Sequence, residues 1–208
     1  LRHKQAVVIG DDGSARLVET PADPPFLNRS EATITGKVNE LGKLEVKVEQ
    51  RLRGDQEILL RYLFRRTPEH KWEELAQQLT AWFGLQGDVT EVKASDPANT
   101  KEPFELRYKI SVPNYMDWSS KESQTYVYLP VVGLTEVSEE AQDTPDPIRI
   151  GSPGVVSVKL RIELPGGFTV RPPVPFSVKR DYAEYSARYS VEGHTFSAER
   201  TLKVVLRE

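Results

Sequence analysis

The sequence contains no cysteine and only three histidines. The lack of cysteine excludes disulfide bonds, thiolate metal ligands and a cysteine nucleophile. Lys and Arg total 28 against 31 Asp and Glu, so the chain lacks the positive excess that attracts nucleic acid. No apolar run reaches the roughly 18 residues of a membrane-spanning helix. We therefore expect a globular protein with no nucleic-acid partner and no membrane span.

Catalytic motifs are also missing from the sequence. His3, His70 and His194 are the only imidazoles, and none stands in a recognisable catalytic motif or forms a pair spaced for metal binding. The acidic residues do not follow the spacing of a calcium-binding loop. We therefore predict no catalytic residue, no metal ion and no cofactor, and we expect that this chain by itself is not an enzyme.

Alternation of apolar and polar side chains dominates the chain and predicts β-strands. A short opening hairpin is expected because two β-branched runs flank the turn Asp11-Asp12-Gly13-Ser14. The predicted strands are 5–9, 15–19, two within 31–53, 89–95, 104–112, 123–131, 155–164, 168–172, 175–180, 183–191 and 195–206.

The alternation gives way to helical spacing between residues 56 and 83. Ile58, Leu59, Tyr62 and Leu63 indicate one helix, and a second is predicted to begin at Thr67-Pro68. The second helix carries an apolar stripe of Trp72, Leu75, Ala76, Leu79, Trp82 and Phe83. The predicted fold class is α+β, mainly β, with antiparallel sheets in a sandwich-like arrangement and a helical insertion at about 56–83.

Prolines suggest how the chain is divided. The segment TPADPP behind the opening hairpin fixes φ and withholds backbone donors, so it is expected to be an extended connector. The expected units are a hairpin and linker at 1–25, an α+β unit at 26–118 and an all-β unit at 119–208. The last two units are alternatively one sandwich.

Aromatic residues gather in two parts of the sequence. The first group is a candidate ligand surface formed by Tyr115, Trp118, Tyr126 and Tyr128. The second group contains Tyr182, Tyr185 and Tyr189. Aromatic side chains in strands pack more often into a core or against a neighbouring strand than against a ligand, so both roles stay open.

The order of several segments resembles a known family. These segments are AVVIGDDGSARLVETPADPP, NRSEATITGKVNELGKLEVKVEQRLRGDQEILLRYLFRR, PFELRYKISVPNYMDW, DPIRIGSPG and ELPGGFTVRPP. Together they are similar to the non-catalytic region of unknown function that follows the papain-like core in bacterial transglutaminase-like proteins. The resemblance covers nearly the whole chain, although each motif alone is weakly specific.

The resemblance implies that this chain is a fragment of a larger protein whose catalytic residues lie upstream. It implies that the opening hairpin completes or abuts the catalytic core on the same polypeptide. It also implies export, and hence a periplasmic or extracellular location. The expected function is that of an accessory and interaction region. The alternative is an independent β module that binds a peptide or a cell-wall glycan.

Overall fold

The computed structural model of the chain describes residues 3–21, 26–82, 86–119, 125–130, 132–134, 150 and 152–205. Strands predominate, with a short helical insertion, which confirms the predicted α+β, mainly β class. In chain order the elements are β1 (Gln5–Ile9), β2 (Ala15–Glu19), β3 (Asn28–Val38), β4 (Leu44–Arg53), α1 (Asp55–Arg66), a 3-10 turn (Glu69–Lys71), α2 (Trp72–Trp82), β5 (Asp88–Ala94), β6 (Phe104–Val112), β7 (Gly154–Glu163), β8 (Phe176–Lys179), β9 (Ala183–Glu192) and β10 (Thr195–Val204).

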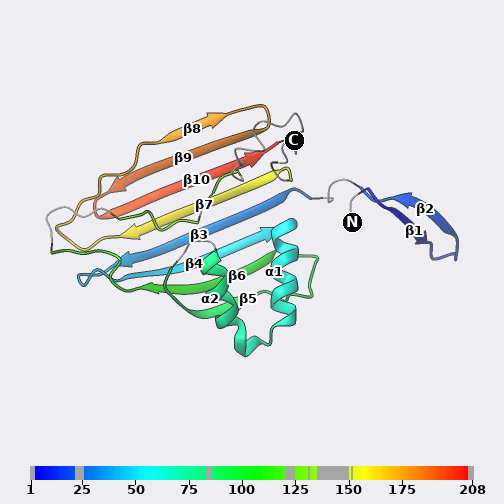
Figure 1. Cartoon of the computed structure of the whole chain (residues 1–208), viewed down its shortest axis with the longest axis horizontal. Coiled ribbons are helices and arrows are strands. Elements are labelled where there is room, and N and C mark those ends of the chain that lie inside the picture. The colour runs from blue at the N-terminus through cyan, green and yellow to red at the C-terminus, as the bar shows by residue number, and fades with distance from the viewer. Residues whose placement is uncertain are drawn as a thin grey trace, which may run out of the picture.

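Eight of these strands form one sheet in the order β5-β6-β4-β3-β7-β10-β9-β8 (Figure 1). Every neighbouring pair is antiparallel, as predicted, except β3 and β7, which are parallel. That pair joins four strands from residues 28–112 to four strands from residues 154–204. The predicted α+β and all-β units therefore contribute to a single continuous sheet.

The two faces of the sheet differ sharply in chemistry. The packed face carries the buried side chains, such as Ile34, Val48 and Leu160. The polar face carries alternate residues such as Glu49 and Arg107, which lie opposite each other on β4 and β6. Successive side chains in a strand point to opposite faces, so the period of two in the sequence separates these surfaces directly.

The two helices cover the packed face over β4, β6 and β5 (Figure 1). Helix α1 follows Gly54, whose φ of 95° lies in the left-handed region that favours glycine. Leu60 and Phe64 on α1 pack into the core. In α2, Ala76 and Leu79 are buried, as the predicted stripe requires.

Two details of the predicted helices need correction. The second helix begins at Trp72 after the 3-10 turn, because Pro68 caps that turn with an extended backbone. Trp82 is 76% exposed although it belonged to the predicted stripe, because it is the final residue of α2, where the apolar face ends. Phe83 lies outside the described residues.

Two predicted strands are absent from the described residues. Residues 168–172 form no strand; Pro172 ends this segment and Pro173 and Pro175 follow it, and prolines cannot donate hydrogen bonds to a β-ladder. Residues 125–130 also form no strand; they lie across the core, where Tyr128 and Leu129 are buried. The remainder of the predicted strand 123–131 lies outside the described residues.

Strands β1 and β2 form a separate two-stranded sheet, as predicted for the opening hairpin. Gly13 makes the tight turn between them with a φ of 78°. Figure 1 shows this hairpin standing apart from the eight-stranded sheet, beyond the end where β3 begins.

Candidate functional site

Three of the four predicted ligand-surface residues lie together. The ring centroids of Tyr115 and Tyr126 are 5.5 Å apart, and those of Tyr115 and Tyr128 are 6.2 Å apart. The Tyr115 hydroxyl donates a 2.7 Å hydrogen bond to the Tyr126 carbonyl. The Tyr128 hydroxyl donates a 2.8 Å hydrogen bond to the Gln86 carbonyl. These bonds hold the segment around residue 126 against the packed face.

Most of this tyrosine group is occupied by packing. Tyr128 is fully buried, Tyr115 is half-buried, and only Tyr126 is largely exposed, at 54%. Burial raises the pKa of Tyr115 to about 12, and it also raises the pKa of Tyr126 and Tyr128. The phenols therefore stay neutral near pH 7, and the group presents a single open ring to a ligand.

Trp118 lies in a different environment from the three tyrosines. Its indole Nε1 donates a 3.1 Å hydrogen bond to the Asn39 carbonyl at the turn between β3 and β4. Its ring lies 3.9 Å from the Phe168 ring, with 35° between the planes. The predicted ligand surface is thus divided between a tyrosine group and a tryptophan contact that joins two loops.

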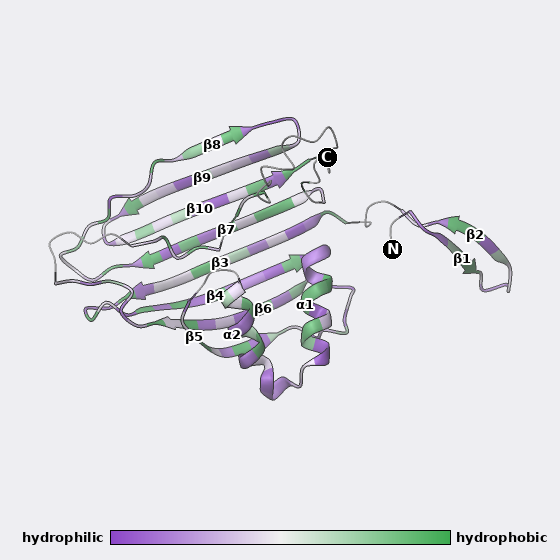
Figure 2. Ribbon diagram, viewed as in Figure 1, coloured by the Kyte–Doolittle hydropathy of each residue, from purple (hydrophilic) through white to green (hydrophobic). Residues whose placement is uncertain are grey.

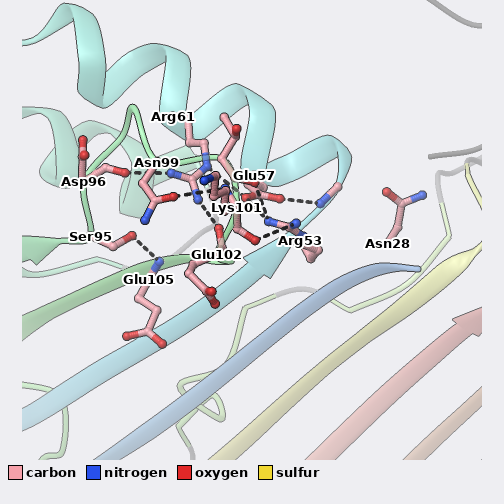
Figure 3. Close-up of polar contacts among 12 residues, drawn as sticks. Asn28, Arg53, Glu57, Arg61, Ser95, Asp96, Asn99, Lys101, Glu102 and Glu105 are labelled. Carbon is pink, nitrogen blue, oxygen red and sulfur yellow. Dashed lines mark hydrogen bonds and ion pairs between the residues drawn. The ribbon is translucent and has the colours of Figure 1, made fainter. Parts of the chain in front are cut away.

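The main buried polar cluster lies under α1 (Figure 3). Glu57 accepts hydrogen bonds from Arg53 at 3.1 Å, from Arg61 at 2.9 Å and from the Gly54 amide at 3.0 Å. Arg61 also donates to the carbonyls of Asp96 and Glu102, at 2.8 and 2.5 Å. Each buried charge therefore has a partner, and the cluster holds the loop before β6 to α1. These contacts give the cluster a structural role.

A shallow groove of about 680 Å³ lies on the polar face. Charged side chains dominate its lining: Lys37, Lys43, Lys47, Lys109, Glu45, Glu91 and Glu163. Lys43 pairs with Glu45 at 2.9 Å, and Lys109 pairs with Glu91 at 2.6 Å. The hydrogen bond from Lys43 lowers the pKa of the Glu45 carboxyl. The opposite charges largely balance, so the groove favours neither an anion nor a cation.

The hairpin exposes large apolar side chains. Val7, Ile9 and Leu17 are 65%, 73% and 67% exposed. Val7 lies opposite Leu17, and Ile9 lies opposite Ala15, so all three large side chains project from the same face. Figure 2 shows hydrophobic positions on both strands. A two-stranded hairpin is marginally stable alone, and apolar side chains left in water add nothing to its stability.

Helix α1 carries a second exposed apolar group. Ile58, Leu59 and Tyr62 are 65%, 54% and 53% exposed. Their spacing predicted the helix, yet the side turned to the sheet is formed by Glu57, Leu60, Arg61 and Phe64. The spacing of apolar residues could not show which side of the helix faces the sheet, because the buried side includes the ion pair between Glu57 and Arg61.

Arg200 is not among the site residues predicted from the sequence. It lies on the packed side of β10, with the same parity as the buried Ala198 and Leu202. Its Nε donates a 3.3 Å hydrogen bond to the Tyr189 hydroxyl. Strand alternation could have revealed it, because the charge interrupts the apolar series at residues 196, 198, 202 and 204.

No protein-family model, curated protein or solved structure matches this chain. Among the described residues there is no group of three or more acidic or histidine side chains placed to hold a metal ion. Within the same part of the chain, no helix combines the length and apolar character needed to cross a membrane.

Proposed function

We propose that this chain is a non-catalytic accessory region that docks onto a neighbouring domain of the same polypeptide through the β1–β2 hairpin. The observation that carries the proposal is the exposure of Val7, Ile9 and Leu17 on one face of an isolated hairpin. Burial of these side chains against a partner would supply stability that two strands lack alone. The hairpin also has two free edges within the described residues, where a partner strand could pair.

The outer face of α1 extends the proposed docking surface. The Asp55 amide donates a 3.1 Å hydrogen bond to the Asn28 side chain, so α1 begins beside the residue where β3 begins. The connector from the hairpin leads to that same residue. A domain that binds the hairpin is therefore held close to the exposed Leu59 and Tyr62, and contact with both surfaces would bury more apolar area than either alone.

The sequence resemblance supports a specific neighbour, a papain-like transglutaminase core. On this proposal the chemistry belongs to that core and this region positions or supports it. An exported location, in the periplasm or outside the cell, belongs to the same proposal and depends on the resemblance alone.

The test compares the 208-residue chain with the polypeptide that its gene encodes. Single variants Val7→Cys and Leu59→Cys report on the two surfaces, and Leu41→Cys, at a turn residue that is 84% exposed, is the matched control. Maleimide labelling is followed at each site by peptide mass spectrometry, so that cysteines elsewhere do not interfere.

We expect labelling at position 7 to be at least about tenfold slower in the encoded polypeptide, which corresponds to about 1.4 kcal/mol of docking free energy. Labelling at position 41 should not change. Equal labelling at position 7 in the two proteins would contradict the proposal. Protection at position 7 without protection at position 59 would restrict docking to the hairpin.

A further inference from the structure

Helix α2 closes one edge of the eight-stranded sheet to further strands. The Gln77 side chain donates a 2.7 Å hydrogen bond to the Gly87 carbonyl and accepts one of 2.8 Å from the Val89 amide on the edge strand β5. One helical turn earlier, the Glu73 carboxylate accepts a 2.8 Å hydrogen bond from the Glu91 amide. An added strand would need these backbone groups, so the side chains of α2 take the place of such a strand.

The opposite edge of the large sheet is also unsuited to strand addition. Its edge strand β8 contains only four residues, and Pro172, Pro173 and Pro175 precede it. Short edge strands and prolines oppose the pairing of another strand. The hairpin stands apart from this sheet (Figure 1), so its two edges are the ones in the described part of the chain that stay open to a partner strand.

The hydrogen bonds of the hairpin show which of its backbone groups face outward. The Gly10 amide donates a 2.8 Å hydrogen bond to the Ser14 carbonyl, and the Thr20 amide donates one of 2.8 Å to the Lys4 carbonyl. Opposed residues in an antiparallel ladder alternate between bonded and non-bonded pairs. The even-numbered residues therefore bond across the hairpin, and the amides and carbonyls of the odd-numbered residues point away from both edges.

The two edges of the hairpin differ in charge. Strand β1 has the sequence QAVVI and carries no charged side chain. Strand β2 has the sequence ARLVE, in which Arg16 and Glu19 are exposed, and Pro21 follows it closely. Charged side chains and prolines are typical of edge strands that face solvent. Strand β2 therefore has the character of a final edge, whereas β1 has that of a strand with a neighbour on each side.

We propose that an edge strand of a β-sheet in the neighbouring domain pairs with β1, so that the hairpin extends the sheet of that domain. The proposal rests on the docking function proposed above. The outward amides of Val7 and Ile9 would donate hydrogen bonds to the added strand. Their side chains, which share one face with Leu17, would continue the packed face of the extended sheet. The same residues thus provide both the backbone pairing and the apolar burial.

Hydrogen exchange at single amides tests this pairing in the 208-residue chain and in the polypeptide that its gene encodes. The outward amides of β1 are those of Val7 and Ile9, and the matched controls are Leu17 and Ala15, which lie directly opposite them on β2. We expect exchange at Val7 and Ile9 to be at least about tenfold slower in the encoded polypeptide, and exchange at Leu17 and Ala15 to be unchanged. Protection on β2 alone, or equal protection on both edges, would overturn the assignment to β1.

Proline variants of the encoded polypeptide provide a second measurement. Proline lacks an N–H group and is tolerated on an edge strand where that group points outward. Val7→Pro is compared with Val7→Ala, and Leu17→Pro with Leu17→Ala, so that loss of the side chain is matched. We expect the Ile9 amide to exchange at least about tenfold faster in Val7→Pro than in Val7→Ala, with no such difference for the Leu17 pair. An equal effect of proline at the two positions would overturn the proposal.

These results also separate strand pairing from docking as such. If labelling of Val7→Cys is slowed but the amides of Val7 and Ile9 exchange equally fast in the two proteins, the hairpin docks through its side chains alone and the strand pairing is wrong. If labelling and exchange are both unchanged, the proposed function is wrong as well. Exchange at Val7 that slows as the concentration of the 208-residue chain rises would identify a second copy as the partner and overturn the proposal.

Discussion

Arg61 Nε donates a 2.9 Å hydrogen bond to Glu57 Oε1 one helical turn earlier, and both side chains are buried where α1 meets the sheet. Glu57 also accepts the Gly54 amide and the Arg53 guanidinium, so one carboxylate joins the end of β4 to the start of α1. The helical insertion is thus attached to the sheet by polar contacts as well as by apolar packing.

Replacement of Glu57 by alanine should destabilise the fold by about 3–5 kcal/mol, because it leaves the buried Arg61 without its counter-ion. Urea unfolding measures this change. The control is Glu49→Gln on the polar face, where the pair with Lys47 is exposed to solvent and should contribute little to stability. A similar decrease in the free energy of unfolding in the two variants would show that the buried cluster stabilises the fold no more than an exposed ion pair does.

Packing of α2 against the sheet gives a second prediction. Leu79 is 5% exposed, so Leu79→Ala should leave a cavity and cost about 2–5 kcal/mol. Trp82, on the same helix, is 76% exposed, and Trp82→Ala should change the unfolding free energy by less than about 0.5 kcal/mol. Melting curves of the two variants distinguish this orientation of α2 from one in which Trp82 is buried.

The tyrosine group should make stability depend on alkaline pH. Burial raises the pKa of Tyr115 from 10.0 to about 12, so the folded state holds this proton more tightly than the unfolded state. Its contribution is complete below pH 10 and is lost as the pH rises towards 12. Urea midpoints across this range should therefore fall, and they should fall less steeply in Tyr115→Phe. If the urea midpoint falls equally steeply with pH in both proteins, Tyr115 does not contribute to the pH dependence of stability.

The sequence predicted most strands because alternation is a local signal. It could not predict the parallel pairing of β3 with β7, in which Ile34 lies opposite Leu160, because that contact depends on the arrangement of the whole chain. The prediction of a strand at residues 168–172 was also wrong. Apolar and polar side chains alternate there, but the prolines in and after this segment cannot donate hydrogen bonds to a β-ladder.

The candidate site shows the same division between local and distant signals. Tyr115 and Tyr126 are close in the sequence, and their rings are in contact in the structure. Trp118 is equally close in the sequence, but its ring contacts Phe168, which is 50 residues away, and no local pattern indicates that contact. Phe176, Ala187 and Arg200 likewise become neighbours only when β8, β9 and β10 pair, and the sequence does not give the register of those strands.

Hydrogen exchange on the 208-residue chain tests most directly the central claim that the hairpin belongs to a neighbouring domain. The amides of Val7, Leu17 and Val18 should exchange at least about a hundredfold faster than those of Val46 and Val158 in the large sheet, a difference of about 2.7 kcal/mol in opening free energy. Equal protection of the two groups would contradict the claim and assign the hairpin to this fold.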